Sequence, residues 1–221
     1  MKIKFRDLET AIIHLKRCEE RRKRVKFTPN AWVNAYDGTE LTERYLNDEL
    51  VSYTGHTFYV PYNKPITEKW RCKMACFLSH MKTLKQFTKP LLILEDDFLP
   101  KDKNVDITNW VLHDVPDDWD ILLLGGFVKP KKGIVLDLKD GWNKLNKSQC
   151  TYYCTHSYIV KDPQKILTMV KKTIPRAYDS YLNYHVYSQV NTYFIQPTMI
   201  IQNSDFISTI DPLDKYNWLS S

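Results

Sequence analysis

One short stretch near the middle of the chain constrains the fold more than any other. Residues 91–94 are four apolar residues in a row, and the acidic run Glu95-Asp96-Asp97 follows them without a break. A continuous apolar run of this length is typical of a β-strand buried on both faces. Three unpaired carboxylates would be costly inside the core, so we expect them where the strand leaves it. Ligand crevices form at the carboxyl ends of strands in open α/β sheets, so this end is the first candidate site.

The order of the three acids carries a second prediction. Side chains alternate across a strand, so Glu95 and Asp97 are expected on one side and Asp96 on the other. Two carboxylates on one face repel each other unless a cation holds them together. A hard divalent ion such as Mn²⁺ or Mg²⁺ prefers oxygen ligands and would do this. The alternative is a charged turn at a strand end, and the triplet alone does not decide between the two.

Composition and charge favour a single α/β domain spanning residues 1–221. A hydrophobic content of 43% is ample for one core. The net charge of +6 is too small and too scattered to indicate a nucleic-acid partner. It suits an anionic ligand such as a nucleotide diphosphate, or loose association with an acidic membrane surface. No segment approaches 18 apolar residues, and the N-terminus lacks an apolar signal region, so we expect a cytoplasmic protein.

The five cysteines allow two interpretations. Cys72 and Cys76 are four residues apart, as are Cys150 and Cys154, and this spacing would suit zinc. The first pair lies in a helical apolar pattern and the second in a strand-like one, where a free cysteine behaves as a small hydrophobe. We therefore favour core thiols in a reduced, intracellular chain over a zinc site.

Apolar patterns divide the chain into alternating strands and helices, which indicates an α/β fold. Residues 68–87 carry apolar side chains at helical spacing. Residues 39–66 are expected to form a helical turn and a long loop over the site, and residues 129–150 an excursion beside it. The expected strands, besides residues 91–94, are residues 11–15, 32–36, 121–124, 155–160 and 191–202.

Polar side chains on three expected helices are candidate ligands. The basic segment 16–24 follows the first strand and is either a solvated face or a phosphate-binding helix start. In the helix of residues 68–87, Lys73 and His80 share one flank, and Ser79 faces away from the apolar stripe. A lone helical histidine is more often structural, so His80 is a second-tier candidate. Asp179, at the start of a short helix, is either an N-cap or a functional carboxylate.

Several of these pieces form an ordered set. They are residues 12–17 with Arg21, 35–38, 76–80, 94–97, 119–125, 178–182, 197–202 and 204–205. The most specific is the Cys-Phe-Leu-Ser-His run at 76–80, with Glu-Asp-Asp about fifteen residues later. Order and spacing over residues 10–207 resemble the family 25 glycosyltransferases, the group of the lipopolysaccharide-core and collagen hydroxylysine galactosyltransferases. The chain departs from the usual family pattern at Met74-Ala75 and at His156-Ser157.

The resemblance implies a GT-A, Rossmann-like fold with a mostly parallel central sheet flanked by helices. It also implies a nucleotide-sugar donor (most often a UDP-sugar), Mn²⁺ dependence and inversion at the anomeric carbon. Asp97 would be the direct metal ligand, Glu95 would assist, and Gln202 or Asp205 would complete the shell. Asp179 would be the general base, with Asp205 as the alternative. The expected nucleotide-binding residues are Leu15, Arg17, Arg21, Ala35, Tyr36, Asp37, Gly38, Lys73, His80, Glu95 and Asp96.

This interpretation predicts an enzyme that moves a hexose from a nucleotide-sugar to a glycan or another hydroxyl acceptor, encoded by a bacterium or a large virus. Two alternatives stay open. A metal-dependent phosphodiesterase or nuclease would use the same acidic cluster, with more acids and histidines converging on it. A non-catalytic nucleotide-sugar-binding module would keep the fold without the chemistry.

Overall fold

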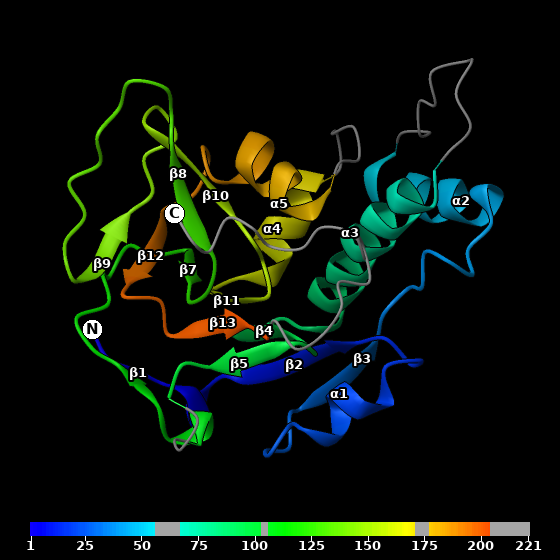
Figure 1. Cartoon of the computed structure of the whole chain (residues 1–221), viewed down its shortest axis with the longest axis horizontal. Coiled ribbons are helices and arrows are strands. Elements are labelled where there is room, and N and C mark those ends of the chain that lie inside the picture. The colour runs from blue at the N-terminus through cyan, green and yellow to red at the C-terminus, as the bar shows by residue number, and fades with distance from the viewer. Residues whose placement is uncertain (56–66, 103–105, 171–176, 204–221) are drawn as a thin grey trace.

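A seven-stranded sheet forms the centre of the protein, in the order β3-β2-β4-β11-β7-β12-β9 (Figure 1). The computed structural model describes residues 1–55, 67–102, 106–170 and 177–203. The strands of this sheet are β2 (Glu9–His14), β3 (Ala31–Asn34), β4 (Leu91–Glu95), β7 (Ile121–Leu123), β9 (Gly141–Lys144), β11 (Ser157–Val160) and β12 (Thr192–Gln196). The acidic strand predicted from residues 91–94 is therefore confirmed as β4, a central member of the sheet.

The sheet is mixed, which corrects the expectation of a mostly parallel one. β2 is parallel to both β3 and β4, and β7 is parallel to β12. In contrast, β11 is antiparallel to β4 and to β7, and β9 is antiparallel to β12. A short apolar strand buried on both faces has the same composition in either direction, so its sequence does not reveal which way it runs. The architecture is α/β and compatible with a Rossmann-like arrangement.

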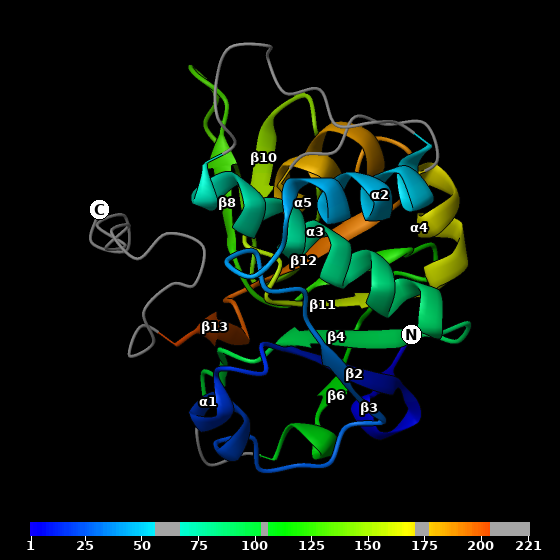
Figure 2. The same cartoon turned by 90° about the vertical axis from the view of Figure 1, so that its right-hand side faces the viewer.

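Four helices cover one face of the sheet: α2 (Glu43–Thr54), α3 (Glu68–Gln86), α4 (Pro163–Val170) and α5 (Tyr178–Tyr181) (Figures 1 and 2). α1 (Glu19–Lys23) lies beyond β2 on the opposite side (Figure 2). α3 agrees with the helix predicted over residues 68–87, and the Thr67 hydroxyl caps it by accepting a hydrogen bond from the amide of Trp70. α2 is longer than the expected helical turn; the loop predicted to follow it, residues 56–66, lies outside the described residues.

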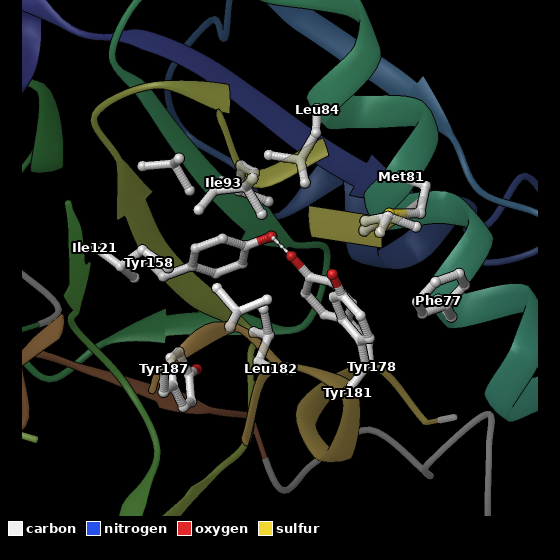
Figure 3. Packing of buried hydrophobic residues seen from close by; sticks show 14 of the residues in the cluster. Phe77, Met81, Leu84, Ile93, Ile121, Tyr158, Tyr178, Tyr181, Leu182 and Tyr187 are labelled. Carbon is white, nitrogen blue, oxygen red and sulfur yellow. Dashed lines mark hydrogen bonds between the residues drawn. The ribbon is translucent and has the colours of Figure 1, made fainter. Parts of the chain in front are cut away.

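Two apolar layers result from the alternation of side chains along the strands. On the helix-covered face, Ile13 and Ile93 belong to one apolar cluster with residues of α3, α4 and α5. Figure 3 shows part of this cluster, including Ile93. On the other face, Ile12 and Leu94 pack against shorter segments that include β1 (Ile3–Lys4), the 3₁₀ turn Ile107–Asn109 and β6 (Val111–Leu112). In β4, the odd-numbered side chains face the helices. Glu95 therefore leaves the sheet on the α3 side.

Short strands outside the main sheet modify three further predictions. Residues 129–150 are not merely an excursion: they include β9, which forms one edge of the sheet, and parts of the antiparallel pair β8 (Phe127–Pro130) and β10 (Cys150–Tyr153). Residues 191–202 form two strands, because Pro197 separates β12 from β13 (Ile200–Gln202). β13 pairs with β5 (Phe98–Pro100), which brings Gln202 next to the acidic end of β4.

The structure also bears on the state of the cysteines and on membrane-spanning helices. All five cysteines are free thiols. Within the described ranges, no helix combines the length and the apolar character needed to cross a bilayer.

Candidate functional site

A cleft of about 700 Å³, including its open mouth, lies at the carboxyl ends of β2, β3 and β4. The chain passes from β2 to β3 on one side and later to β4 on the other, so the strand order reverses about β2. Ligand crevices in open α/β sheets form at such a reversal. The cleft is lined by Ile13, Leu15, Arg17, Arg21, Ala35, Tyr36, Asp37, Gly38, Cys72, Cys76, Ser79, His80, Glu95, Asp96, Asp97 and Gln202. Most of the expected metal and nucleotide residues are therefore brought together.

Asp96 is fully engaged by protein groups. One carboxylate oxygen accepts a hydrogen bond from Arg21 Nη1 at 2.9 Å. The other is 2.9 Å from His14 Nδ1 and accepts from the amide of Leu15 at 3.1 Å. Asp96, His14 and Arg21 are all buried. These bonds join the ends of β2 and β4 to α1, so Asp96 lines the cleft as a residue that holds its walls together.

Asp97 is satisfied on only one side. Its Oδ2 accepts a hydrogen bond from Gln202 Nε2 at 2.7 Å, and its backbone carbonyl accepts from Asn203 at 2.7 Å. Its Oδ1 is buried and has no hydrogen-bond partner within the described ranges. Burial, and then the negative charge of Glu95, raise the pKa of Asp97 to about 7. Arg21 Nη1 is 3.9 Å from Oδ2, so the charge of Asp97 is only partly compensated, and Oδ1 has no hydrogen-bond donor among the described residues.

Glu95 lies against α3 and contacts His80. His80 Nε2 is 3.1 Å from Glu95 Oε1, and His80 Nδ1 is 2.9 Å from the Tyr158 hydroxyl. The Tyr158 hydroxyl is in turn 2.9 Å from that of Tyr178, as Figure 3 shows. Burial tends to raise the pKa of Glu95, but the hydrogen bond and charge of His80, together with the charges of His156 and Arg21, outweigh it and leave that pKa lowered. Glu95 is therefore held as a carboxylate facing the cleft.

These donors fit a hard divalent cation. Asp97 offers a buried carboxylate oxygen without a hydrogen-bond partner in the described part of the chain, Glu95 adds a second carboxylate, and Gln202 has an amide oxygen. A cation at this point would also offset the repulsion between the two acids that raises the pKa of Asp97. The predicted placement of Glu95 and Asp97 apart from Asp96 agrees with this arrangement, although β4 already ends at Glu95.

The turn after β3 forms the opposite wall. Arg17 Nε donates a hydrogen bond to Asp37, and the amide of Tyr36 donates to the Ser79 hydroxyl at 2.9 Å. Gly38 is required here, since a Cβ atom at this position would overlap the backbone of Cys72 in α3. Ser79 therefore does not face away from the core, as its helical position suggested. It is buried because α3 packs against the β3 turn as well as the sheet.

Of the two predicted catalytic acids, Asp179 is described by the structure and Asp205 is not. Asp179 does not line the cleft, but its charge acts on Glu95 and Cys76. It is not the N-cap of α5, which is Ala177; its carboxylate accepts from the amide of Ser180 instead. Burial raises the pKa of Asp179, and the nearby positive charge of Lys73 partly opposes this rise. Lys73 is not among the lining residues, and Asp205 lies outside the described residues.

Ile13, Cys72, Cys76 and Ser79 line the cleft but were not predicted as site residues, and neither was His14, which contacts Asp96. His14 ends an apolar strand, as Glu95 does, and a polar residue at the end of a buried strand is the signal that could have identified it. Cys76 lies one helical turn before His80, on the same side of α3. Among the described residues, neither cysteine pair lies together with the further ligands that a zinc site based on the pair would need. In the described part of the chain, Cys76 instead groups with His80 and Glu95.

Comparison with known proteins adds no further evidence: no model of a known protein family and no curated protein matches the chain.

Proposed function

We propose that this chain is a metal-dependent glycosyltransferase of the GT-A type, which moves a hexose from a nucleotide-sugar to a hydroxyl of a glycan. One observation carries the proposal: the cleft at the reversal of strand order combines the partly exposed Arg17 with the acidic end of β4. Arginines suit the diphosphate of a nucleotide-sugar, and the acids suit the cation that accompanies it. The order of motifs along the sequence, which resembles family 25 glycosyltransferases, supports the same conclusion.

The donor would lie between the ends of β2 and β3. In this arrangement Leu15, Ala35, Tyr36 and Gly38 form the walls for the nucleoside. Arg17 is partly exposed at the mouth, with 43% of its side chain accessible, and is the residue best placed to reach a phosphate. Arg21 is buried against Asp96 and keeps the site in shape.

Asp97 and Glu95 would hold Mn²⁺ or Mg²⁺, with Gln202 as the third protein ligand. A bound divalent ion supplies charge stabilisation for the departing diphosphate. The residues that would hold it come from the end of β4 and from β13, and β13 pairs with β5, the strand that follows β4 in the chain. His80 keeps Glu95 ionised and oriented toward the cleft.

Inversion in a single displacement requires a base for the proton of the acceptor hydroxyl. Asp179 is our choice, because burial raises its pKa toward the range useful for a base. Its carboxylate lies at the start of α5, beside the cleft rather than within it, which is where an acceptor would approach. Asp205 is the alternative base.

The test is donor turnover with defined nucleotide-sugars. Purified protein should release UDP from a UDP-hexose in the presence of Mn²⁺, faster when a glycan acceptor is added. UDP should raise the unfolding temperature only when Mn²⁺ is present, since a ligand that binds the folded state stabilises it. Cleavage of DNA or RNA would instead assign a nuclease. Stabilisation by the nucleotide-sugar without any turnover would leave a binding module.

Asp179→Asn separates the chemical step from binding. We expect transfer to fall by about 10²- to 10⁴-fold, the usual contribution of a general base, while UDP affinity with Mn²⁺ stays within about twofold. Calorimetric titration of UDP and an acceptor-dependent rate assay measure the two quantities. An unchanged transfer rate would remove Asp179 from the mechanism and direct attention to Asp205.

A further inference from the structure

The cleft contains a second set of donor atoms that the proposed function does not use as a set. Cys76 Sγ, a nitrogen of His80 and a carboxylate oxygen of Glu95 all lie within 4.8 Å of one another. We propose that these three residues form a binding site for a thiophilic divalent ion such as Zn²⁺, distinct from the oxygen-ligand site at Asp97. The inference depends on the donor atoms alone and holds whether or not the chain is a glycosyltransferase.

The backbone places these donors without special strain. Cys76 and His80 are four residues apart in α3, so their side chains project from the same face, one turn above the other. Glu95 ends β4, and its amide is fixed by a hydrogen bond to the carbonyl of His156 at 2.9 Å. Two of the three ligands thus come from one long helix and the third from a central strand, which are the rigid elements that suit a metal site.

The spacing is close to that of a bound ion. Bond lengths of about 2.0–2.3 Å at tetrahedral angles separate two zinc ligands by roughly 3.5 Å. His80 Nε2 and Glu95 Oε1 are already 3.1 Å apart, and no pair in the set exceeds 4.8 Å. A closure of about 1 Å therefore completes three ligands, and the fourth position faces the cleft, where water would fill it.

His80 is oriented for this role by its surroundings. Its ring stacks on that of Tyr178, with centroids 4.0 Å apart and planes 10° from parallel. Its Nδ1 contacts the Tyr158 hydroxyl, which contacts the Tyr178 hydroxyl. Hydroxyl hydrogens rotate, so the Tyr158 hydroxyl can accept a hydrogen bond from Nδ1–H of His80, which leaves the Nε2 lone pair for an ion. Metal-binding histidines commonly donate their second N–H in this way.

The donor set and its charge select the ion. Thiolate and imidazole favour Zn²⁺, Co²⁺ or Cd²⁺, whereas Mn²⁺ and Mg²⁺ favour oxygen alone. Burial, and then the negative charges of Glu95, Asp179 and Asp97, raise the pKa of the Cys76 thiol, so a thiolate is favoured there only together with a bound cation. Because Glu95 belongs to both donor sets, occupation by Zn²⁺ should weaken Mn²⁺ binding at Asp97.

The test uses Co²⁺ as a spectroscopic replacement for Zn²⁺ in the full-length protein. We expect a thiolate-to-cobalt charge-transfer band that Zn²⁺ displaces. Cys76→Ser should abolish the band and weaken Zn²⁺ binding at least tenfold. The matched control is Cys72→Ser, since Cys72 lines the same cleft one turn earlier but is not in the set; it should keep the band, as should Asp97→Asn.

A band that survives in Cys76→Ser, or that disappears equally in Cys72→Ser, would overturn the proposal. X-ray absorption of the zinc-loaded wild-type protein keeps the test decisive if Cys76→Ser does not fold. We expect one sulfur at about 2.3 Å with nitrogen and oxygen ligands at about 2.0–2.2 Å. Two sulfur ligands, or none, would refute the site.

Discussion

Asp96 and Asp97 are neighbours in the chain, yet the protein treats them in opposite ways. Both oxygens of Asp96 accept hydrogen bonds, from Arg21 and from the end of β2. Asp97 has one oxygen bonded to Gln202 and one buried oxygen without a partner in the described ranges. Removing one partner of a compensated buried pair is strongly destabilising, whereas a buried charge that lacks a full set of partners already costs free energy. Asp96 therefore stabilises the fold, whereas Asp97 is available to bind a ligand.

We expect the largest effect on stability from removing Asp96, the carboxylate whose charge is compensated. Asp96→Ala removes the carboxylate that Arg21 and His14 share, and it leaves the buried Arg21 charge without its closest acceptor. We expect the free energy of unfolding to fall by roughly 3–5 kcal/mol. Urea denaturation measures it. Asp140→Ala, at an exposed position, is the control and should change stability by no more than about 0.5 kcal/mol. A loss below about 1 kcal/mol for Asp96→Ala would show that the pairing is not structural.

Asp97→Asn tests whether the partly compensated carboxylate of Asp97 binds a metal ion. The substitution keeps the size of the side chain and its contact with Gln202 but removes the charge offered to a cation. Metal-dependent donor turnover should fall by about 10²- to 10³-fold, as expected when one electrostatic contribution to the transition state is lost, and folding should be retained. Rate assays with Mn²⁺ and circular dichroism measure the two properties. Full activity would exclude Asp97 as a metal ligand.

Stability as a function of pH should distinguish the same two acids. The pKa of Asp97 is raised to about 7 in the folded protein, against an ordinary value of about 4. Between these values the folded protein keeps a proton that the unfolded chain has lost, so the free energy of unfolding falls as pH rises and levels off above about pH 7. Without metal, Asp97→Asn should lack this fall and be more stable than the wild type at about pH 8, by roughly 1–3 kcal/mol.

Urea denaturation in the presence of a chelator, from about pH 5 to about pH 8, gives this comparison. Titrating groups far from Asp97 contribute similarly to both proteins, so the difference between the two curves reports on Asp97 together with Glu95, whose charge acts on it. Saturating Mn²⁺ should restore the stability of the wild type and not that of the variant. Parallel curves would show that the Asp97 carboxylate is already compensated.

The sequence predicted the elements that carry the site better than the sheet that holds them. The helix over residues 68–87 was predicted because its apolar residues recur at helical spacing, and the strand over 91–94 because its apolar run is continuous and short. The direction of β11 and the edge position of β9 were not. Both depend on which strands pair in three dimensions, and a local pattern carries no information on that pairing.

The same distinction, between what a local pattern predicts and what depends on packing in three dimensions, applies to the site residues. Polar residues directly after predicted strands, such as Arg17 and Asp97, fall in one cleft because strand ends meet at a common edge. The grouping of Cys76 with His80 and Glu95 was not predicted, because it depends on how α3 is rotated against the sheet. Ser79 was misplaced for the same reason: α3 packs on two sides, so the apolar stripe alone does not define its buried face.

The two arginines of the cleft differ in the same way as Asp96 and Asp97, and the smallest change in stability is expected at Arg17. Arg21 is buried against Asp96, whereas Arg17 is 43% exposed and pairs with Asp37. An exposed ion pair contributes at most about 1 kcal/mol to stability, so Arg17→Gln should barely change the urea midpoint. If Arg17 contacts the donor diphosphate, UDP affinity in Mn²⁺ should fall about tenfold, the value of one charge-assisted hydrogen bond. Arg21→Gln should instead reduce stability, as Asp96→Ala does. Calorimetric titration of UDP decides the question: unchanged affinity in Arg17→Gln would place the diphosphate elsewhere in the cleft.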